Sequence, residues 1–425
     1  MDYRVFGKTG LRVSVITLGT MRFLHGWDPP HDHLPEDSLA HARFVLNQAL
    51  SAGINVIETA RWYGKSQRLI GQILPELDYD RADYLIMTKA PVARDAQMMR
   101  EWVLESRGHL NVDHIELFAV HGVNSVEDYE RLIQPGGPLS ALEQLREEGV
   151  IGHIGIATHA AMELQLRMVE SGFFSFINLH YYRFMTVNKP VIEVANRHNM
   201  GVFIISPNDK GGQLYEPPDQ LKALCNPLPP ALFNERWLLN HTEIHTLSVG
   251  PNQPGQLDLH QQAIGQNPLM GPVEQQIESR IADQFDNAPL GRCGVCRACL
   301  PCPEQIDIPS VLRLRNLADR FQMLAYGQTR YSMMAPGDFW NPSALGNACT
   351  TCGDCLPRCP ESLDIPVLLK STHPLLDSWG FRLKRAWSPI DQRLPALVRL
   401  KMRSMKPFFR RFRAAISRLF RPVFG

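Results

Sequence analysis

Residues Gly53–Gly71 read G-I-N-V-I-E-T-A-R-W-Y-G-K-S-Q-R-L-I-G, and this stretch contains the unit that decides the fold. A short run of mostly apolar residues at Asn55–Thr59 predicts a buried strand. An amphipathic pattern over Ser66–Leu77 follows it and predicts a helix. A strand that leads directly into a helix is half of a β–α–β unit, so the stretch favours a parallel sheet.

The same alternation recurs through the first 250 residues and predicts eight strands: Val15–Gly19, Asn55–Thr59, Tyr84–Lys89, Glu116–His121, His153–Thr158, Phe176–Tyr181, Gly201–Ser206 and Thr246–Gly250. Helical patterns lie between them, among them Ser38–Ala52, Leu139–Glu148, Ala161–Ser171 and Lys189–His198. Eight repeats in about 250 residues favour a closed (β/α)8 TIM barrel. The alternative is an open doubly wound sheet, which would want a G-x-G-x-x-G turn after its first strand, and the sequence has none there.

The composition of the 425 residues is that of a globular protein, with 44% hydrophobic residues, 20% charged residues and a formal net charge of +1. No apolar run approaches the roughly 18 residues of a spanning helix, and the N-terminus shows no signal-peptide core. We therefore expect a cytoplasmic protein. Its charge is uneven, because residues 381–425 hold 13 Lys and Arg and one acid, Asp391. The rest of the chain is consequently acidic.

Polar side chains gather at the carboxyl ends of the predicted strands, where (β/α)8 enzymes hold their active sites. Glu58, Lys89 and His121 end the second, third and fourth strands, and Tyr63 lies in the loop after Glu58. One such residue alone is more often structural, but four on neighbouring strand ends favour a site. The segment His25–His33 holds three His and two Asp; it reads as a polar loop over the barrel mouth, with a metal site as the alternative.

Five segments resemble the aldo-keto reductase family: Met1–Phe23, Gly53–Gly71, Ile86–Ala90, Val112–Gly122 and Ile151–His159. The resemblance covers residues 1–285 and implies reduction of a small-molecule carbonyl with NADPH or NADH. It implies a catalytic role for Glu58, Tyr63, Lys89 and His121. In this scheme Tyr63 protonates the developing alkoxide, and the nearby ammonium of Lys89 lowers the phenol pKa. The carboxylate of Glu58 would hold Lys89 in place, and His121 would orient the carbonyl oxygen.

The resemblance also implies cofactor contacts at Gly19, Thr20, Thr158, Asn178, Ser206 and Lys210. The stretch that begins at Ser206 and contains Lys210 suits a pyrophosphate loop, with a plain turn as the alternative. The chain departs from the family in three places. Glu58 stands where the family has Asp, Ile205 stands where an aromatic residue often stacks on nicotinamide, and Ser248–Gln261 has no Lys or Arg. The last departure leaves the choice between NADPH and NADH open.

Eight of the nine cysteines form two runs, Cys293-x2-Cys296-x2-Cys299-x2-Cys302-Pro303 and Cys349-x2-Cys352-x2-Cys355-x3-Cys359-Pro360. The second run matches the ferredoxin pattern in which three thiolates hold one [4Fe–4S] cluster and the fourth reaches the other cluster. The pattern predicts two clusters: one on Cys293, Cys296, Cys299 and Cys359, the other on Cys349, Cys352, Cys355 and Cys302. The first run is one residue short, which leaves this sharing open.

An internal repeat supports two related halves: C-P-E-Q-I-D-I-P-S-V-L-R (Cys302–Arg313) aligns with C-P-E-S-L-D-I-P-V-L-L-K (Cys359–Lys370). In each copy a proline, Pro309 or Pro366, suits the first turn of a helix. Zinc and disulfides are the alternatives, but zinc sites favour paired C-x2-C knuckles, and a reducing compartment disfavours disulfides. The remaining cysteine, Cys225, is expected to be a structural thiol.

The spacer between the runs contains a helical pattern at Val311–Phe321 and resembles an α-helical dicluster ferredoxin domain. Some relatives of the aldo-keto reductases carry such a cassette. Nicotinamide passes two electrons and a cluster takes one, so coupling them usually needs a flavin, for which no fingerprint is present. Two hypotheses follow. One is an oxidoreductase with an electron-transfer module; the other is an electron-transfer or redox-sensing adaptor with a catalytically weak barrel, serving a protein partner.

The chain is thus expected to have three parts: the barrel at 1–285, the iron–sulfur domain at 286–375 and a basic tail at 376–425. In the tail, apolar residues from Phe408 onward fall on one face of a helical wheel, with arginines around the rest. Such a helix suits the anionic cytoplasmic surface of a membrane. Docking on an acidic partner protein or on the chain's own acidic body are the alternatives. No nucleic acid is expected, since no binding module for it is present.

Overall fold

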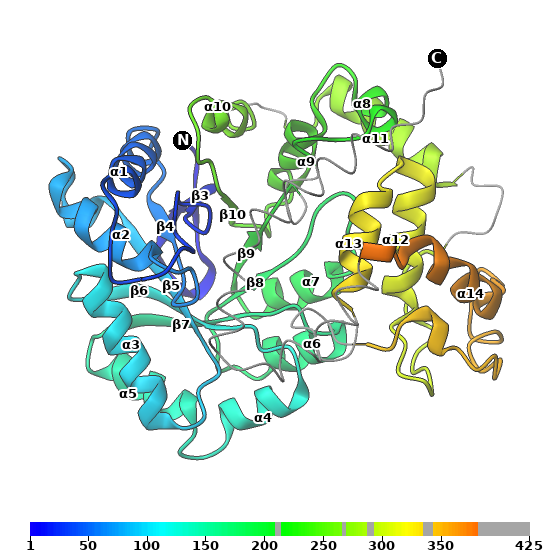
Figure 1. Cartoon of the computed structure of the whole chain (residues 1–425), viewed down its shortest axis with the longest axis horizontal. Coiled ribbons are helices and arrows are strands. Elements are labelled where there is room, and N and C mark those ends of the chain that lie inside the picture. The colour runs from blue at the N-terminus through cyan, green and yellow to red at the C-terminus, as the bar shows by residue number, and fades with distance from the viewer. Residues whose placement is uncertain (209–213, 266–268, 287–292, 335–342, 381–425) are drawn as a thin grey trace.

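The computed structural model describes residues 1–208, 214–265, 269–286, 293–334 and 343–380 (Figure 1). The tail segment 381–425 and Lys210 lie outside the described residues, so the predictions made for them are not tested by this structure. In the described part of the chain, no helix combines the length and the apolar character that crossing a membrane requires.

Eight parallel strands form a closed barrel, as the alternation predicts, so the alternative of an open sheet is wrong. They are β3 (Ile16–Gly19), β4 (Val56–Glu58), β5 (Leu85–Pro91), β6 (Ile115–His121), β7 (Ile151–Ala157), β8 (Phe176–Leu179), β9 (Gly201–Ile205) and β10 (Thr246–Val249). The barrel closes where β10 pairs with β3, with Leu247 opposite Ile16. Parallel pairing brings the carboxyl ends of all eight strands to one rim.

Helices surround the barrel (Figure 1): α1 (Glu36–Ser51), α2 (Ser66–Ile73), α3 (Ala96–Leu110), α4 (Val126–Ile133), α5 (Pro138–Glu147), α6 (Met162–Glu170), α7 (Lys189–Arg197), α8 (Asp219–Cys225), α9 (Pro230–Leu239), α10 (Gln256–Gln261) and α11 (Pro272–Asp286). Local sequence sets their ends. The carboxylate of Asp95 accepts the Met98 N–H at 2.9 Å and starts α3. Asn111 ends α3 in the left-handed conformation.

A short antiparallel hairpin, β1 (Tyr3–Val5) and β2 (Arg12–Ser14), precedes the barrel and was not expected from the sequence. Just after β1, Phe6 is fully buried and packs with Phe176 and Phe203 from inside the barrel. A side-chain carbon on Gly201 would lie 2.6 Å from the Phe6 ring, so glycine is required there. Because it brings Phe6 into the barrel interior, the hairpin contributes to the core at the end opposite the carboxyl rim.

His245 belongs to the same buried base. Its side chain is 8% exposed, its Nδ1 accepts the Val202 N–H at 3.0 Å, and its ring meets Phe6 edge-on at 5.6 Å. Burial lowers the pKa of His245 to about 4, and the nearby Arg4 acts in the same direction. The folded protein therefore favours the neutral ring. The resulting stability is present above the unfolded pKa of about 6.5 and is lost as the pH falls towards 4.

We expect the free energy of unfolding to fall by about 2 kcal/mol between pH 7 and pH 5 on account of His245. His245→Asn keeps an acceptor for the Val202 N–H and cannot gain a proton, so this component should vanish. Urea denaturation at the two pH values measures it. The matched control is His198→Gln, at an exposed position, which should keep the wild-type pH dependence. Equal acid sensitivity in the wild type and in His245→Asn would contradict the assignment.

The cysteine-rich region forms helices α12 (Ile308–Phe321), α13 (Leu324–Ser332) and α14 (Ile365–Leu376), with a short 3₁₀ helix at Gly346–Ala348. In Figure 1 these helices lie beside the barrel, next to α6 and α7. The expected domain boundary at residue 285 falls at the end of α11, and the expected start of the tail at residue 376 coincides with the end of α14.

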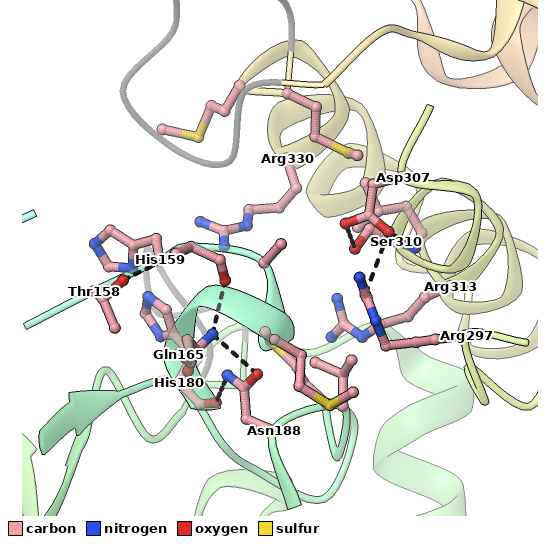
Figure 2. Close-up of a pocket in the computed structure, with 18 residues that line it drawn as sticks. Thr158, His159, Gln165, His180, Asn188, Arg297, Asp307, Ser310, Arg313 and Arg330 are labelled. Atoms are coloured by element: carbon pink, nitrogen blue, oxygen red, sulfur yellow. Dashed lines mark hydrogen bonds and ion pairs between the residues drawn. The ribbon is translucent and has the colours of Figure 1, made fainter. Parts of the chain in front are cut away.

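The cysteine-rich helices pack on the loop that follows β8. The rings of Phe184 and Phe321 lie 5.4 Å apart, the hydroxyls of Tyr182 and Tyr326 are 3.1 Å apart, and Arg313 donates to the Phe184 carbonyl at 2.8 Å. One continuous set of buried side chains runs from the outside of the barrel into α12, α13 and α14. A cleft beside this contact is lined by residues of both regions (Figure 2).

Candidate functional site

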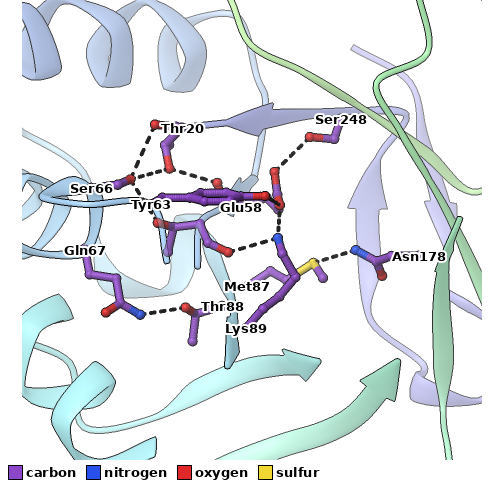
Figure 3. A network of polar contacts seen from close by, with 11 residues as sticks. Thr20, Glu58, Tyr63, Ser66, Gln67, Met87, Thr88, Lys89, Asn178 and Ser248 are labelled. Carbon is purple, nitrogen blue, oxygen red and sulfur yellow. Dashed lines mark hydrogen bonds and ion pairs between the residues drawn. The ribbon is translucent and has the colours of Figure 1, made fainter. Parts of the chain in front are cut away.

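The strand ends bring the four residues expected to be catalytic together at the carboxyl rim. Glu58 is the last residue of β4, Lys89 lies in β5, and His121 ends β6. Tyr63 comes from the loop between β4 and α2, and its ring lies edge-on to the His121 ring at 6.0 Å. Figure 3 shows Glu58, Tyr63 and Lys89 grouped with Ser248.

Glu58 and Lys89 form a buried ion pair through Oε1 and Nζ, with side chains 5% and 2% exposed. The Lys89 ammonium also donates to the Thr59 carbonyl at 3.0 Å. The second carboxylate oxygen of Glu58 accepts the Ser248 hydroxyl at 2.9 Å. Burial lowers the pKa of Lys89 well below its ordinary value, and the adjacent carboxylate works against that shift. The pair is thus dry and supported by hydrogen bonds on both sides.

The Tyr63 hydroxyl faces the carboxylate. It donates to Glu58 Oε1 at 3.4 Å, while Lys89 Nζ stands 5.0 Å from the centre of the Tyr63 ring. Burial raises the pKa of Tyr63 above its ordinary value. The expectation that Lys89 lowers the phenol pKa is therefore not met in this arrangement. The physical reason is that burial desolvates the phenol, which favours its neutral, protonated form.

Gly19 and Thr20, expected to contact a cofactor, lie directly against this group. A side-chain carbon on Gly19 would be 2.7 Å from the Ser248 hydroxyl and 3.1 Å from Glu58 Oε2, so the position has room only for glycine. The Thr20 hydroxyl donates to the Glu58 carbonyl at 2.9 Å and shares a hydrogen bond with Ser66 at 2.6 Å. In this structure both residues support the position of Glu58.

Thr158 and Asn178 lie on neighbouring strand ends, where the Thr158 N–H donates to the Asn178 carbonyl at 3.2 Å. The Thr158 hydroxyl donates to the Val123 carbonyl at 2.6 Å. Asn178 is fully buried, and its Nδ2 contacts the Met87 sulfur at 3.8 Å. Its Oδ1 has no hydrogen-bond partner among the described residues. An unsatisfied buried acceptor is costly, and the NH2 of a nicotinamide carboxamide is a donor that fits it.

The other expected contacts are placed less fully. Ser206 follows β9 with a φ of 52°, in the left-handed region that few side chains adopt. Lys210 lies outside the described residues. In the segment His25–His33, the His25 ring pairs with Asp28 at 3.4 Å and with Asp37 at 3.2 Å. Within the described residues, no three His, Cys, Asp or Glu side chains converge closely enough to hold a single metal ion.

Three residues that contact the site were not singled out from the sequence. Ser248 lies near the carboxyl end of β10 and donates to Glu58, and a polar residue so close to a strand end is a signal that could have found it. Trp62 and Trp27 are exposed aromatic residues at the rim: Trp62 lies 5.5 Å from the His121 ring, and Trp27 lies 6.2 Å from the Tyr63 ring. The one sequence signal for these two tryptophans is that they lie in loops that follow predicted strands.

The cysteines of the two runs line two separate cavities, each with four thiols. Cys293, Cys296 and Cys299 line one cavity together with Cys359 from the second run. Cys349, Cys352 and Cys355 line the other cavity together with Cys302 from the first run. The structure therefore groups the cysteines in the two sets that the ferredoxin pattern predicts, although the first run is shorter.

The two cysteine loops repeat the same backbone conformation. Val295 and Thr351, each two residues after the first cysteine of its run, have a φ of 60°. Arg297 and Gly353, two residues further on, also have positive φ. β-branched residues rarely adopt this conformation, and it recurs where backbone N–H groups turn towards an anionic group such as a cluster. Both loops are thus shaped alike for a ligand that accepts backbone hydrogen bonds.

The helices after each run also start alike. Asp307 caps α12 by accepting the Ser310 N–H at 3.4 Å, and Asp364 caps α14 by accepting the Val367 N–H at 3.2 Å. Both caps have φ −74° and ψ 76°, and Pro309 and Pro366 lie in the first turns as expected. The sequence repeat is therefore a structural repeat.

Burial raises the pKa of the Cys293 thiol to about 11 and that of Cys299 to about 12. Apolar surroundings thus hold these thiols protonated unless a cationic metal replaces the protons. Four thiols around a small apolar cavity are the donor set of a [4Fe–4S] cluster. The residues present therefore fit two such clusters.

Comparison with known proteins agrees with this description. Residues 292–363 match the model of the 4Fe-4S dicluster domain, and residues 15–252 match that of the aldo/keto reductase family. An aldo-keto reductase from Bacillus halodurans in its holo form superposes with a TM-score of 0.55 at 22% identity, over 66% of this chain and 96% of that one, and shares the barrel fold.

Two curated relatives match shorter stretches. L-galactose dehydrogenase from Arabidopsis thaliana is 27% identical over 163 residues, 37% of this chain and 48% of that protein. A putative voltage-gated potassium channel subunit beta from Schizosaccharomyces pombe is 25% identical over 181 residues, 39% of this chain and 47% of that protein. The chain thus spans about half the length of these relatives. The aldo/keto reductase model covers more than half of the chain, so the protein belongs to the aldo/keto reductase family, and its C-terminal part is a 4Fe-4S dicluster domain.

Proposed function

We propose that the protein is a nicotinamide-dependent oxidoreductase that reduces a carbonyl group of a small molecule, with two [4Fe–4S] clusters for electron transfer in its C-terminal domain. The observation that carries the first part is the convergence of Glu58, Tyr63, Lys89 and His121 at the carboxyl rim of the barrel. The buried, unpartnered Oδ1 of Asn178 supports a nicotinamide beside them.

When bound, NADPH or NADH supplies a hydride. The chain's own residues handle the proton. The Tyr63 hydroxyl holds a proton that the substrate oxygen takes, and His121, edge-on to Tyr63, orients that oxygen. Glu58 Oε1 contacts both the Tyr63 hydroxyl and the Lys89 ammonium. A proton can therefore return to Tyr63 from Lys89 through the carboxylate, and Lys89 then regains one proton from solvent, which replaces the proton that leaves with the product.

For the clusters, we propose that each cavity holds one [4Fe–4S] cluster on the four thiols that line it: Cys293, Cys296, Cys299 and Cys359, and Cys349, Cys352, Cys355 and Cys302. Bound clusters would accept and pass single electrons. A protein partner that exchanges single electrons is the expected recipient or donor.

One observation favours the alternative of an adaptor with a weak barrel. The phenol of Tyr63 faces a carboxylate, and its pKa is raised by burial, so the hydroxyl gives up its proton reluctantly. In that case the barrel would position the clusters and a bound nucleotide would serve as a redox signal. The oxidoreductase should turn over carbonyl substrates and the adaptor should not, so a measurement of turnover distinguishes the two functions.

We expect protein purified without oxygen to bind NADPH or NADH and to reduce members of a panel of aldehydes and ketones. Tyr63→Phe removes the proton donor, so turnover should fall by about 10² to 10⁴-fold, while nucleotide affinity stays within about twofold of the wild type. Fluorescence titration and stopped-flow absorbance measure the two quantities. Nucleotide binding without turnover, unchanged in Tyr63→Phe, would favour the adaptor. Absence of nucleotide binding would contradict both.

A further inference from the structure

The cleft between the barrel and the cluster domain is distinct from the four-residue group at the rim. Its barrel side includes Thr158, His159 and His180 from the ends of β7 and β8, and Gln165 from α6. Its other side comes from the cluster domain, and Figure 2 shows Arg330 reaching from α13 towards Thr158 and His159. The space enclosed, including the part open to solvent, is about 710 Å³.

Arginines outnumber carboxylates among the described residues that line this cleft. Arg297, Arg313 and Arg330 all line it, and Asp307 is the one carboxylate among its described lining residues. Arg297 pairs with Asp307 at 3.6 Å and with Glu163 at 2.8 Å, and its side chain is 8% exposed. Arg313 donates to the Phe184 carbonyl. These contacts hold Arg297 and Arg313 in position. The described lining thus sets three arginines against one carboxylate in a half-enclosed space, where charges interact strongly.

A second observation points to a ligand. Gln165 is 2% exposed, and its Nε2 donates to the Ala160 carbonyl at 2.7 Å and to Asn188 Oδ1 at 3.2 Å. Because Asn188 Nδ2 donates to the His180 carbonyl, Asn188 Oδ1 is an acceptor, and the orientation of the Gln165 amide is fixed. Its Oε1 is buried without a partner among the described residues. A buried acceptor of this kind calls for a donor such as a hydroxyl.

We propose that this cleft binds a small hydroxylated organic anion, whose carboxylate or phosphate group lies among Arg297, Arg313 and Arg330 and whose hydroxyl donates to Gln165 Oε1. Arginine suits such oxyanions because its guanidinium is always charged and carries five N–H donors. The site lies beside the first cluster, since Arg297 lines both the cleft and the cavity of Cys293, Cys296, Cys299 and Cys359. Binding there does not depend on carbonyl reduction at Tyr63.

Calorimetry on the full chain, purified without oxygen, tests the proposal with three probes: malate, succinate and inorganic phosphate. Malate and succinate differ by one hydroxyl, so the ratio of their affinities measures the contribution of the hydrogen bond from that hydroxyl to Gln165. Phosphate against succinate separates the two oxyanion types. We expect malate to bind at least about fivefold more tightly than succinate. In Gln165→Met this preference should disappear while succinate binds as before.

Arg330→Gln and Arg313→Gln should each weaken the best-binding probe by about tenfold or more, because a hydrogen bond to a charged group is lost, and Arg330→Lys should recover part of the loss. The control is Arg100→Gln in α3, which removes an exposed guanidinium paired with Glu148, the residue that follows α5. It should leave affinity unchanged. Circular dichroism confirms that each variant is folded.

Three results would overturn the proposal. The first is that none of the probes binds, and the second is that the probes bind the Arg330→Gln and Arg313→Gln variants as tightly as the wild type. The third is that NADPH displaces malate while both arginine variants lose NADPH affinity, which would assign the cleft to the nucleotide. Equal affinity for malate and succinate in the wild type would overturn the hydroxyl contact. Loss of carbonyl turnover in Tyr63→Phe bears on the rim group alone, so failures of the two proposals are distinguishable.

Discussion

Replacing Cys359 with serine is expected to remove the iron held by the first cysteine run, although Cys359 belongs to the second run. The reason is spatial: Cys359 lines the cavity of Cys293, Cys296 and Cys299. The thiols there lie in apolar surroundings that raise their pKa, so three of them without the fourth hold a cluster poorly. Iron and sulfide analysis should show about half of the wild-type content, and electron paramagnetic resonance should show the same missing signal as in Cys293→Ser.

The reciprocal change completes the test. Cys302→Ser should lose the cluster that Cys349→Ser loses, because Cys302 lines the second cavity. The control is Cys225→Ala, at a buried thiol on α8 far from both runs in the sequence, which should retain all the iron. If instead Cys359→Ser and Cys349→Ser lose the same signal, each run would hold its own cluster, and the exchanged assignment would be wrong.

Replacing Lys89 with methionine is expected to destabilise the barrel by about 3–5 kcal/mol, the cost of leaving one member of a buried ion pair without its partner. The Glu58 carboxylate would keep only hydroxyl donors, from Ser248 and Tyr63, in a site closed to water. Urea denaturation measures the loss. Carbonyl turnover should fall with it, since the ammonium also returns the proton to Tyr63 in the proposed reaction.

A second substitution separates charge from packing. Combining Glu58→Gln with Lys89→Met leaves no buried charge, and the amide oxygen can still accept from Ser248. Most of the lost stability should therefore return, while turnover should not. A double variant as unstable as Lys89→Met would show that packing, not the orphaned charge, is responsible. The exposed pair of Arg100 and Glu148 is the control, and Arg100→Gln should change stability little.

The sequence is enough to predict the barrel because its signal is repeated: eight strands alternate with helices, and each strand ends within two residues of the expected position. The N-terminal hairpin was missed because strands of three residues are too short to show an alternation of apolar and polar residues. Its contribution to the fold is one contact, the packing of Phe6 inside the barrel. The spacing of the cysteines likewise predicts the two sets, and the short first run left their sharing open until the structure placed Cys359 with the first run and Cys302 with the second.

Geometry within the site was less predictable. The residue types at Glu58, Tyr63 and Lys89 predicted that these side chains lie together. They did not predict that the Tyr63 hydroxyl contacts the carboxylate of Glu58 rather than the ammonium of Lys89. That choice depends on the side-chain conformations of Glu58 and Tyr63, which the residue types do not encode. The arginine cleft was not predicted at all, because its lining comes from strand ends, α6, the first cysteine run, α12 and α13. No spacing in the sequence relates these segments.

The continuous packing between the barrel and α12, through Phe184 against Phe321 and Tyr182 against Tyr326, has a consequence for electron flow. A carrier on a flexible arm delivers electrons by travelling between donor and acceptor. A carrier packed against the side of the barrel cannot travel in this way. If the domain carries electrons as proposed, the length of their path is therefore set when the chain folds, and an external redox partner would have to dock at the iron–sulfur domain itself.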